Sequence, residues 1–186
     1  MKIAISGSIG SGKSEACNYL RSIGYDVFDC DAVNARLLEK GNEGYLEVRK
    51  HFPECFEEDE LNKKKLSALV FSDDQKRKEL EGIMHPLILN RLNARKDDPL
   101  FAEVPLLFES GWDAYFDHNI LICSDEKILI RRLIERGLKE EEIKARLSAQ
   151  MSVEEKKKRA DILISNNGSL EDLYRAIDEC LKVILC

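Results

Sequence analysis

Several residue patterns that would assign this chain of 186 residues to a class are missing from it. No apolar stretch approaches the roughly 20 residues that a membrane-spanning helix needs. The N-terminus lacks the charged and then apolar order of a secretory signal, and the six cysteines contain no C-x-x-C pair. These absences argue against a membrane protein, a secreted disulfide framework and a zinc site. We therefore expect a cytoplasmic protein with reduced thiols.

An excess of positive charge is missing as well. The formal net charge is -6, so a broad basic surface for nucleic acid is not expected. The chain is 44% hydrophobic and 34% charged, which is enough apolar material for a core beneath a charged surface. We expect one domain with a small insertion, acting as a monomer on small molecules and not on nucleic acid or membrane.

The segment GSIGSGKS at 7–14 matches the phosphate-loop pattern G-x-x-x-x-G-K-[ST]. The apolar residues before it predict a buried strand, and the pattern of SEACNYLRSIG after it predicts a helix. Backbone N–H groups of such a loop bind phosphate at the N-terminus of the helix. Lys13 would reach the outer phosphates, and the Ser14 hydroxyl would bind Mg²⁺. The loop predicts a site for a nucleoside triphosphate.

Short apolar runs alternate with helical patterns along the rest of the chain. Strands are expected at 2–5, 25–28, 101–108, 120–123 and 162–164. This alternation predicts an α/β fold with a central parallel sheet. The polar stretch at about 32–98 predicts a helical subdomain without strands, and a second charged helical stretch covers about 125–159.

The motifs that accompany the loop favour a small kinase. The GTPase signatures D-x-x-G and N-K-x-D are missing, and the chain is short for an ATPase motor. Asp29 and Asp31 follow the second expected strand, at the sheet edge where open α/β proteins place their chemistry. A carboxylate there can accept the proton of an attacking hydroxyl, although either aspartate could instead cap the following helix.

A second carboxylate follows the third expected strand. VPLLFE ends in Glu109, which resembles the Walker-B arrangement of an acidic residue that holds Mg²⁺ at a strand end. Pro105 is unusual in a central strand and predicts irregular pairing there. The alternative is a surface glutamate.

Arginines suited to a closing lid lie in the second helical stretch. Arg132 and Arg136 are four residues apart and share a helix face, as do Arg146 and Gln150. The planar guanidinium suits the charge of a transferring phosphoryl group, although the same arginines could form salt bridges on a helix surface. KKKR at 156–159 is interpreted as a solvated helix face.

Taken in order, the motifs resemble those of the dephospho-CoA kinases. The resemblance runs through SGSIGSGKS, VFDCDAVNARLL, HPLI, VPLLFE, RRLIERG, ARLSAQMS and ADILISNNGSLEDL. It implies transfer of the γ-phosphate of ATP to the ribose 3′-hydroxyl of dephospho-CoA, with Mg²⁺. It also implies a three-layer P-loop fold with a five-stranded parallel sheet of order 2-3-1-4-5, a helical acceptor-binding region and a lid.

The resemblance also implies residue roles. Asp31 matches the general base and Arg136 the lid arginine, with Lys13 acting on the phosphates. The nucleotide-binding residues would be Gly7, Gly10, Ser11, Gly12, Lys13, Ser14, Glu15, Arg132 and Asn167, and the metal-binding residues Ser14 and Glu109. His85 of HPLI either touches the acceptor or organises a turn at Pro86. Glu15, where the family often has threonine, places a carboxylate near the triphosphate.

Two other functions compete with this hypothesis. Another small-molecule P-loop kinase, for a nucleoside monophosphate or a sugar acid, would use the same loop and lid. A regulator that binds ATP without transferring phosphate would keep the loop but would not need Asp31 and Arg136.

Overall fold

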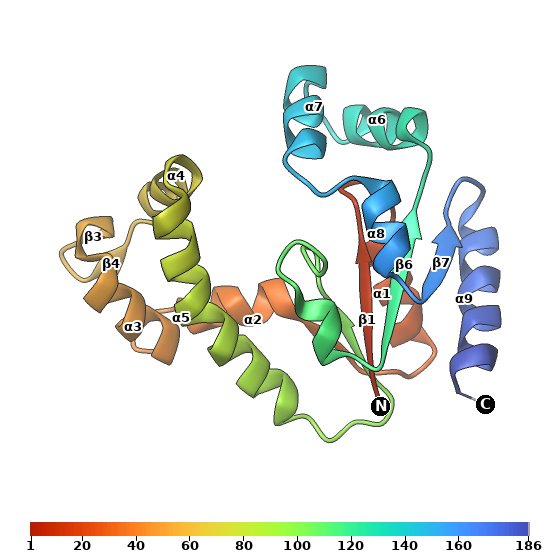
Figure 1. The fold of residues 1–186 in the computed structure, drawn as a ribbon, viewed down its shortest axis with the longest axis horizontal. Coiled ribbons are helices and arrows are strands. Elements are labelled where there is room, and N and C mark those ends of the chain that lie inside the picture. The colour runs from red at the N-terminus through yellow and green to blue at the C-terminus, as the bar shows by residue number, and fades with distance from the viewer. Residues whose placement is uncertain (186) are drawn as a thin grey trace. The chain divides into compact units, whose positions relative to one another are not determined.

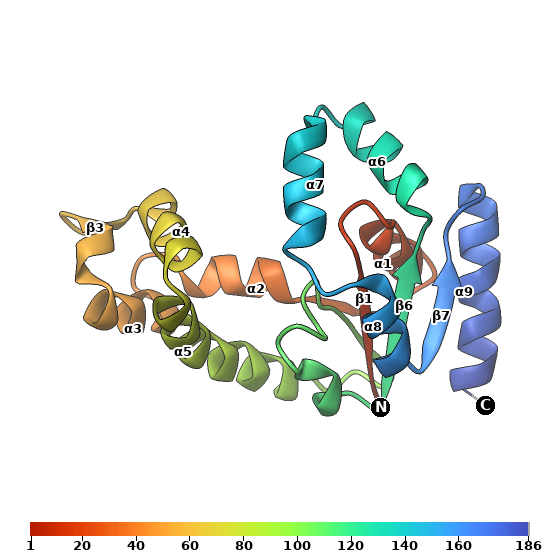
Figure 2. The ribbon, with the colours of Figure 1, turned by 45° about the horizontal axis from the view of Figure 1, so that its top comes forward.

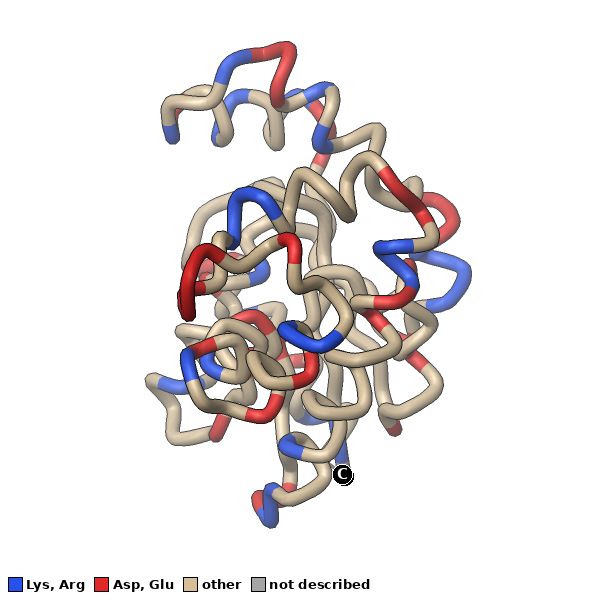
Figure 3. The backbone as a smooth tube through the Cα atoms, turned by 90° about the vertical axis from the view of Figure 1, so that its left-hand side faces the viewer, with Lys and Arg blue, Asp and Glu red and all other residues tan. Residues whose placement is uncertain are grey.

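The computed structural model describes residues 1–185 and divides the chain into two compact units. The first unit contains Met1–Asp29 and the chain from Asp97 onward, and the second contains Cys30–Lys96. Lysine, arginine, aspartate and glutamate are interspersed along the backbone (Figure 3). Within residues 1–185, no helix has the length and apolar character to cross a membrane.

A five-stranded parallel sheet forms the centre of the first unit (Figure 1). Its spatial order is β2-β5-β1-β6-β7. Counted in chain order among themselves, these five strands stand in the order 2-3-1-4-5. The strands are β1 (Lys2–Gly7), β2 (Val27–Asp29), β5 (Leu100–Glu103), β6 (His118–Cys123) and β7 (Ile162–Ser165). The predicted α/β class and P-loop sheet are confirmed.

Helices cover both faces of this sheet. Side chains of α1 (Lys13–Ser22) and α9 (Leu170–Ile184) join the apolar residues of β1, β5, β6 and β7 in one buried cluster. In Figures 1 and 2, α8 (Val153–Arg159) passes in front of β6 whereas α1 lies behind it. The remaining helices of this unit are η2 (Trp112–Tyr115), α6 (Glu126–Glu135) and α7 (Glu140–Ser148). Because both faces are buried, the central strands are almost continuously apolar.

Local sequence explains where the last helices begin. The Ser169 hydroxyl accepts a hydrogen bond from the Asp172 N–H, and Asp172 in turn accepts from Ser169 N, which forms a capping box at α9. Ser152 and Glu155 form the same arrangement at α8. These reciprocal bonds fix the chain at the start of α9, just after β7, and at the start of α8, within the 125–159 segment.

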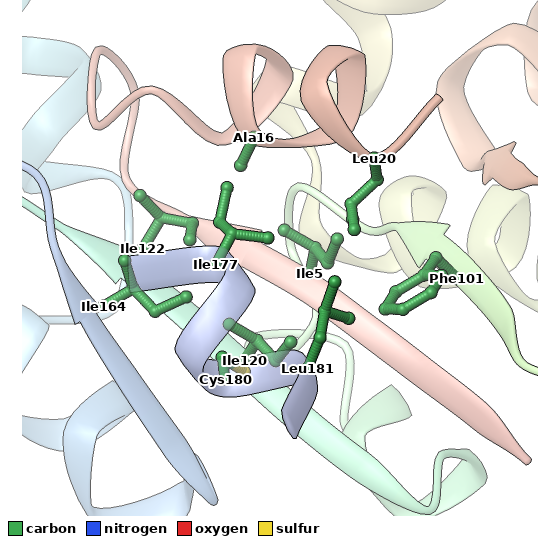
Figure 4. A pocket seen from close by; sticks show the side chains of 10 residues that line it. All are labelled: Ile5, Ala16, Leu20, Phe101, Ile120, Ile122, Ile164, Ile177, Cys180 and Leu181. Atoms are coloured by element: carbon green, nitrogen blue, oxygen red, sulfur yellow. The ribbon is translucent and has the colours of Figure 1, made fainter. Parts of the chain in front are cut away.

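A small gap lies within the apolar core of this unit (Figure 4). Its volume is about 10 Å³, and side chains from the sheet, α1 and α9 surround it. An apolar space of this size offers a water molecule no hydrogen-bond partner, so we interpret it as a packing defect and not as a ligand site. The lining residues are Ile5, Ala16, Leu20, Phe101, Ile120, Ile122, Ile164, Ile177, Cys180 and Leu181.

The second unit is mainly helical. It contains α2 (Cys30–Leu37), α3 (Glu43–His51), η1 (Pro53–Cys55), α4 (Lys63–Ser72) and α5 (Asp74–Asn93). The expectation that this segment has no strand is wrong, because β3 (Phe56–Glu57) and β4 (Glu60–Leu61) form a short antiparallel hairpin. Each of these strands has only two residues, which is too short to show the alternation of apolar and polar residues that identifies a strand in a sequence.

The expected turn at Pro86 is also absent, because α5 continues through this residue. Proline removes one helical hydrogen bond, and the carbonyl that loses its partner belongs to the residue four positions earlier. That residue is Gly82. His85 is therefore a half-buried residue of a continuous helix, and burial lowers the pKa of its imidazole.

The cysteines described by the structure carry free thiols, as expected. Cys17 and Cys180 are buried in the first unit, where Cys123 is partly exposed, and Cys30 and Cys55 are buried in the second. Burial raises the pKa of the Cys180 thiol to about 11. These thiols therefore pack as small apolar side chains.

Candidate active site

The phosphate loop connects β1 to α1, as its sequence predicts. Gly7 ends β1 where a Cβ atom would lie only 2.5 Å from the backbone carbonyl oxygen of Ile122 on β6. Gly12 precedes α1 with φ at 95°, a left-handed conformation that favours glycine. A Cβ atom on Gly12 would lie 2.2 Å from Nδ2 of Asn166. Gly7 is therefore required because the backbone of β6 lies so close to it. Gly12 is required by its left-handed conformation and by the nearby side chain of Asn166.

Lys13 and Ser14 meet a carboxylate that the sequence interpretation did not select. Lys13 Nζ lies 3.0 Å from Oε1 of Glu103, and the Ser14 hydroxyl donates to the same oxygen at 2.8 Å. Burial alone would raise the pKa of Glu103, but the charge of Lys13 and the hydrogen bonds from Ser14 and Lys13 give a net lowering. Glu103 is therefore an ionised carboxylate directly beside the phosphate loop.

The prediction that the third strand runs to Phe108 and ends at Glu109 is wrong. β5 ends at Glu103, and residues 104–111 form an irregular segment in which Leu107 and Phe108 are buried whereas Leu106 is half-exposed. Glu109 accepts a hydrogen bond from Met151 N at 3.1 Å, and its Oε1 lies 2.8 Å from Lys156 Nζ. Its other oxygen is buried and has no hydrogen-bond partner among residues 1–185. The strand-end carboxylate beside Ser14 is Glu103, so Glu109 loses the basis for its predicted metal role.

The same contacts correct the interpretation of KKKR as a solvated face. The side chain of Lys156 is 0% exposed and forms the ion pair with Glu109. Arg159 donates to Asp113 through Nε at 2.9 Å and to the carbonyl oxygen of Phe108 at 2.6 Å. Lys156 and Arg159 are three residues apart and so lie on one side of α8. Together they hold the segment after β5 in place.

Asn166 joins the phosphate loop to the helix that carries Arg132. Its Nδ2 donates to the carbonyl oxygen of Ser11 at 2.8 Å, and its Oδ1 lies 3.5 Å from Nη2 of Arg132. Arg132 also donates to the Ser124 hydroxyl at 3.2 Å, and Ser124 donates to the Asn166 carbonyl at 2.7 Å. Asn166 is 4% exposed. It is a site residue that sequence reasoning missed.

The neighbouring Asn167 was predicted to bind nucleotide. In the structure its Oδ1 accepts from the backbone N–H of Asp125 at 2.9 Å, immediately before α6 begins. Asn167 thus fixes the start of the helix that bears the arginines. The pair NN in the sequence does not indicate which asparagine faces the loop, because only the tertiary contact with Ser11 distinguishes them.

The two arginines expected in the lid differ in their surroundings. Arg132 lies within α6 and is partly buried by its contacts with Ser124 and Asn166. Arg136 is the residue after α6, its side chain is exposed, and Gly137 follows it with φ at 87°. Past α7, the Gln150 side chain accepts a hydrogen bond from Ile9 N of the phosphate loop at 3.2 Å. Arg132 and Gln150, on either side of α7, therefore each contact the loop or its neighbours.

The two aspartates after the second strand belong to different elements. Asp29 is the last residue of β2 and pairs in register with Glu103 of β5. Asp31 lies in the first turn of α2, in the second unit. Because the strand ends at Asp29, its side-chain alternation does not extend to Asp31.

The chemistry of the first unit's site is that of a phosphate-binding centre. It offers backbone N–H groups at a helix N-terminus, one ammonium group, one hydroxyl and one ionised carboxylate, with guanidinium groups on the adjoining helix. Among residues 1–185 there is no cluster of three or more His, Cys, Asp or Glu side chains that could hold a metal ion. A metal here would be held by few protein oxygens together with phosphate, which suits Mg²⁺.

Comparison with known proteins places this geometry in a family. The family model described as dephospho-CoA kinase matches residues 1–172. A dephospho-CoA kinase of Thermus thermophilus is 42% identical over 184 residues, covering 96% of this chain and 89% of that protein. One from Helicobacter pylori is 36% identical over 193 residues, covering 98% and 97%.

Solved structures agree in fold. A crystal structure of a Thermus thermophilus protein superposes with a TM-score of 0.87 at 41% identity, covering 99% of this chain and 97% of that chain. The dephospho-CoA kinase from Campylobacter jejuni gives 0.72 at 29% identity, covering 99% and 98%. A shikimate kinase from Acinetobacter baumannii gives 0.60 at 14% identity, covering 98% and 92%, and shares the fold alone.

Proposed function

Since the chain belongs to the dephospho-CoA kinase family, we propose that Lys13, Asp31 and Arg136 carry out its reaction. That reaction is the ATP-dependent phosphorylation of dephospho-CoA, the last step of coenzyme A biosynthesis. The observation that carries the assignment of the reaction to the phosphate loop is the cluster of Lys13, Ser14 and Glu103 there. The alternative of another small-molecule kinase is not favoured.

Lys13 and the loop would bind the triphosphate of ATP. Ser11 N donates to the carbonyl oxygen of Ser8 at 3.0 Å, so the N–H groups of Gly10 and Gly12 would offer the hydrogen bonds, and the N-terminus of α1 favours negative charge. Lys13 now pairs with Glu103, and its ammonium group would turn to the outer phosphates when the nucleotide enters. The neutralised γ-phosphoryl group then accepts a nucleophile more readily.

Asp31 is proposed as the general base. The ribose 3′-hydroxyl oxygen attacks the γ-phosphorus, the bond from that phosphorus to the β-γ bridging oxygen breaks, and ADP leaves. The hydroxyl proton would pass to the Asp31 carboxylate. Two facts support this role, namely the match of DCD to the family motif and the place of Asp31 two residues beyond the end of β2.

Arg136 and Arg132 would have different roles in the lid. Arg132 is held near the loop by Ser124 and Asn166, so it suits ground-state binding of the nucleotide. Arg136 is exposed after α6 and is free of such restraint, so it suits contact with the phosphoryl oxygens during transfer. We propose that 125–159 forms the lid and that the second unit binds the acceptor.

Mg²⁺ is proposed to bind beside Ser14 and Glu103 and not at Glu109, because Glu103 is the carboxylate at the end of β5 that contacts Ser14. Hydroxyl and carboxylate oxygens are hard ligands, and the two side chains already share one hydrogen bond. When bound, the ion would neutralise charge on the β- and γ-phosphates. A monomer in the cytoplasm, acting on ATP and dephospho-CoA, completes the proposal.

Substitution of Asp31 tests the assignment of the base. Asp31→Asn keeps the shape of the side chain and removes the proton acceptor, so kcat for coenzyme A formation should fall about 10²- to 10⁴-fold. ATP binding, measured by calorimetry, should be nearly unchanged. Asp29→Asn is the matched control and should have a milder effect. Loss of activity in Asp29→Asn with near-normal turnover in Asp31→Asn would show that the base is misplaced.

A further inference from the structure

The phosphate loop of this chain is followed by a negative charge. Glu15 comes directly after Ser14, in the first turn of α1, where the triphosphate is proposed to bind. The helix N-terminus itself tolerates a carboxylate, but a bound polyanion competes for the same positive potential. A carboxylate free to turn toward the nucleotide would weaken ATP binding. The structure contains a contact that restrains it.

That contact comes from α9. The hydroxyl of Tyr174 donates a hydrogen bond to Oε1 of Glu15 at 2.6 Å. A bond of this length to an ionised acceptor is among the stronger hydrogen bonds in proteins. It also raises the pKa of Tyr174, because the neutral phenol is the form that donates. The carboxylate is thereby directed along the side of α1 that packs on α9.

Tyr174 is itself fixed by a second tyrosine. The rings of Tyr19 and Tyr174 stack with centroids 4.2 Å apart and planes at 7°. Tyr19 in turn donates to Oδ1 of Asp178 at 2.8 Å, one helical turn beyond Tyr174 on α9. Because Tyr19 also lies one turn after Glu15 on α1, the four side chains form a continuous ladder between the two helices.

We propose that Tyr174 is a positioning residue for nucleotide binding, whose hydroxyl holds the Glu15 carboxylate against α9 and away from the triphosphate. The inference rests on the proposed binding of ATP at the phosphate loop and adds a residue outside that loop. Tyr174 does not need to touch the nucleotide for this role. Its effect is transmitted through the position of one charge.

The test is a double-mutant cycle between Tyr174 and Glu15. Tyr174→Phe keeps the stacked ring and removes only the hydroxyl. We expect its KM for ATP, and its Kd for ATP by calorimetry, to rise about fivefold, with kcat within twofold of the parent. The rise should shrink in high salt, because the repulsion of a partly exposed charge is screened. In a Glu15→Gln background, Tyr174→Phe should change neither constant.

Tyr19→Phe is the matched control, because it removes a hydroxyl from the same ladder without touching Glu15. It should leave the ATP constants unchanged. An equal rise for Tyr174→Phe with and without Glu15→Gln would overturn the proposal by showing a packing effect, and so would no rise at all. Failure of the parent protein to bind ATP would instead refute the proposed function, so the two failures are distinguishable.

Discussion

Replacing Lys156 by methionine should lower the free energy of unfolding by about 3 kcal/mol, near the lower end of the range for breaking a buried ion pair. The side chain of Lys156 is 0% exposed, and that of its partner Glu109 is 19% exposed. Methionine preserves most of the packed volume but leaves the carboxylate without a counter-charge. Glu109 would keep the hydrogen bond from Met151 N, and its partial exposure would admit some water, so the upper end of the range is not expected.

A second substitution separates the contribution of the two charges to stability from the contribution of side-chain packing. Lys156→Met combined with Glu109→Gln removes both charges and keeps an acceptor for Met151 N, so most of the lost stability should return. Urea unfolding followed by the fluorescence of Trp112 measures both variants, because this residue is the single tryptophan and is buried in the unit that contains the pair. Equal destabilisation of the single and double variants would refute the electrostatic reasoning, as would a loss below about 1 kcal/mol in the single variant.

Three further outcomes follow from the site and from the second unit. Glu103→Gln should raise the Mg²⁺ concentration needed for half-maximal activity at least about tenfold, while Glu109→Gln should leave that concentration unchanged. The opposite result would show that Glu109 holds the metal. Arg136→Ala should lower kcat about 10³-fold, and Arg136→Lys should recover little of that loss. An effect confined to the KM for ATP would show that Arg136 binds the nucleotide and does not act in the transition state. Burial holds the pKa of His85 below its ordinary 6.5, so the unfolded chain binds this proton more readily and stability should fall as the pH drops below that value. His85→Gln should reduce that fall, and an unchanged pH profile in urea unfolding would contradict it.

The sequence predicted the parts of this molecule that depend on neighbouring residues. The phosphate loop was located because its glycines, Lys13 and Ser14 stand at fixed spacings between a strand and a helix. The five parallel strands were located because buried strands form short apolar runs. Both patterns involve residues that are close in sequence, so they can be recognised without knowledge of the fold.

The errors arose where tertiary contacts decide. VPLLF continues the apolar run of β5, and periodicity cannot distinguish an irregular apolar segment from a strand. The burial of Lys156 depends on Glu109, which lies 47 residues earlier in the chain. Likewise, only the contact with Ser11 separates Asn166 from Asn167. For Lys156 and Asn166 the deciding partner is distant in sequence.

The positions of the free thiols allow local opening of each unit to be measured from the rate at which its cysteines react. Cys17 and Cys180 lie in the core of the first unit, and Cys55 is buried in the second. Since only a thiolate exposed to solvent reacts with an alkylating reagent, each buried thiol is modified only when its surroundings open. Partly exposed Cys123 supplies an internal reference for the reagent. Peptide mass spectrometry after timed alkylation would therefore follow the opening of the two units separately, without any engineered cysteine.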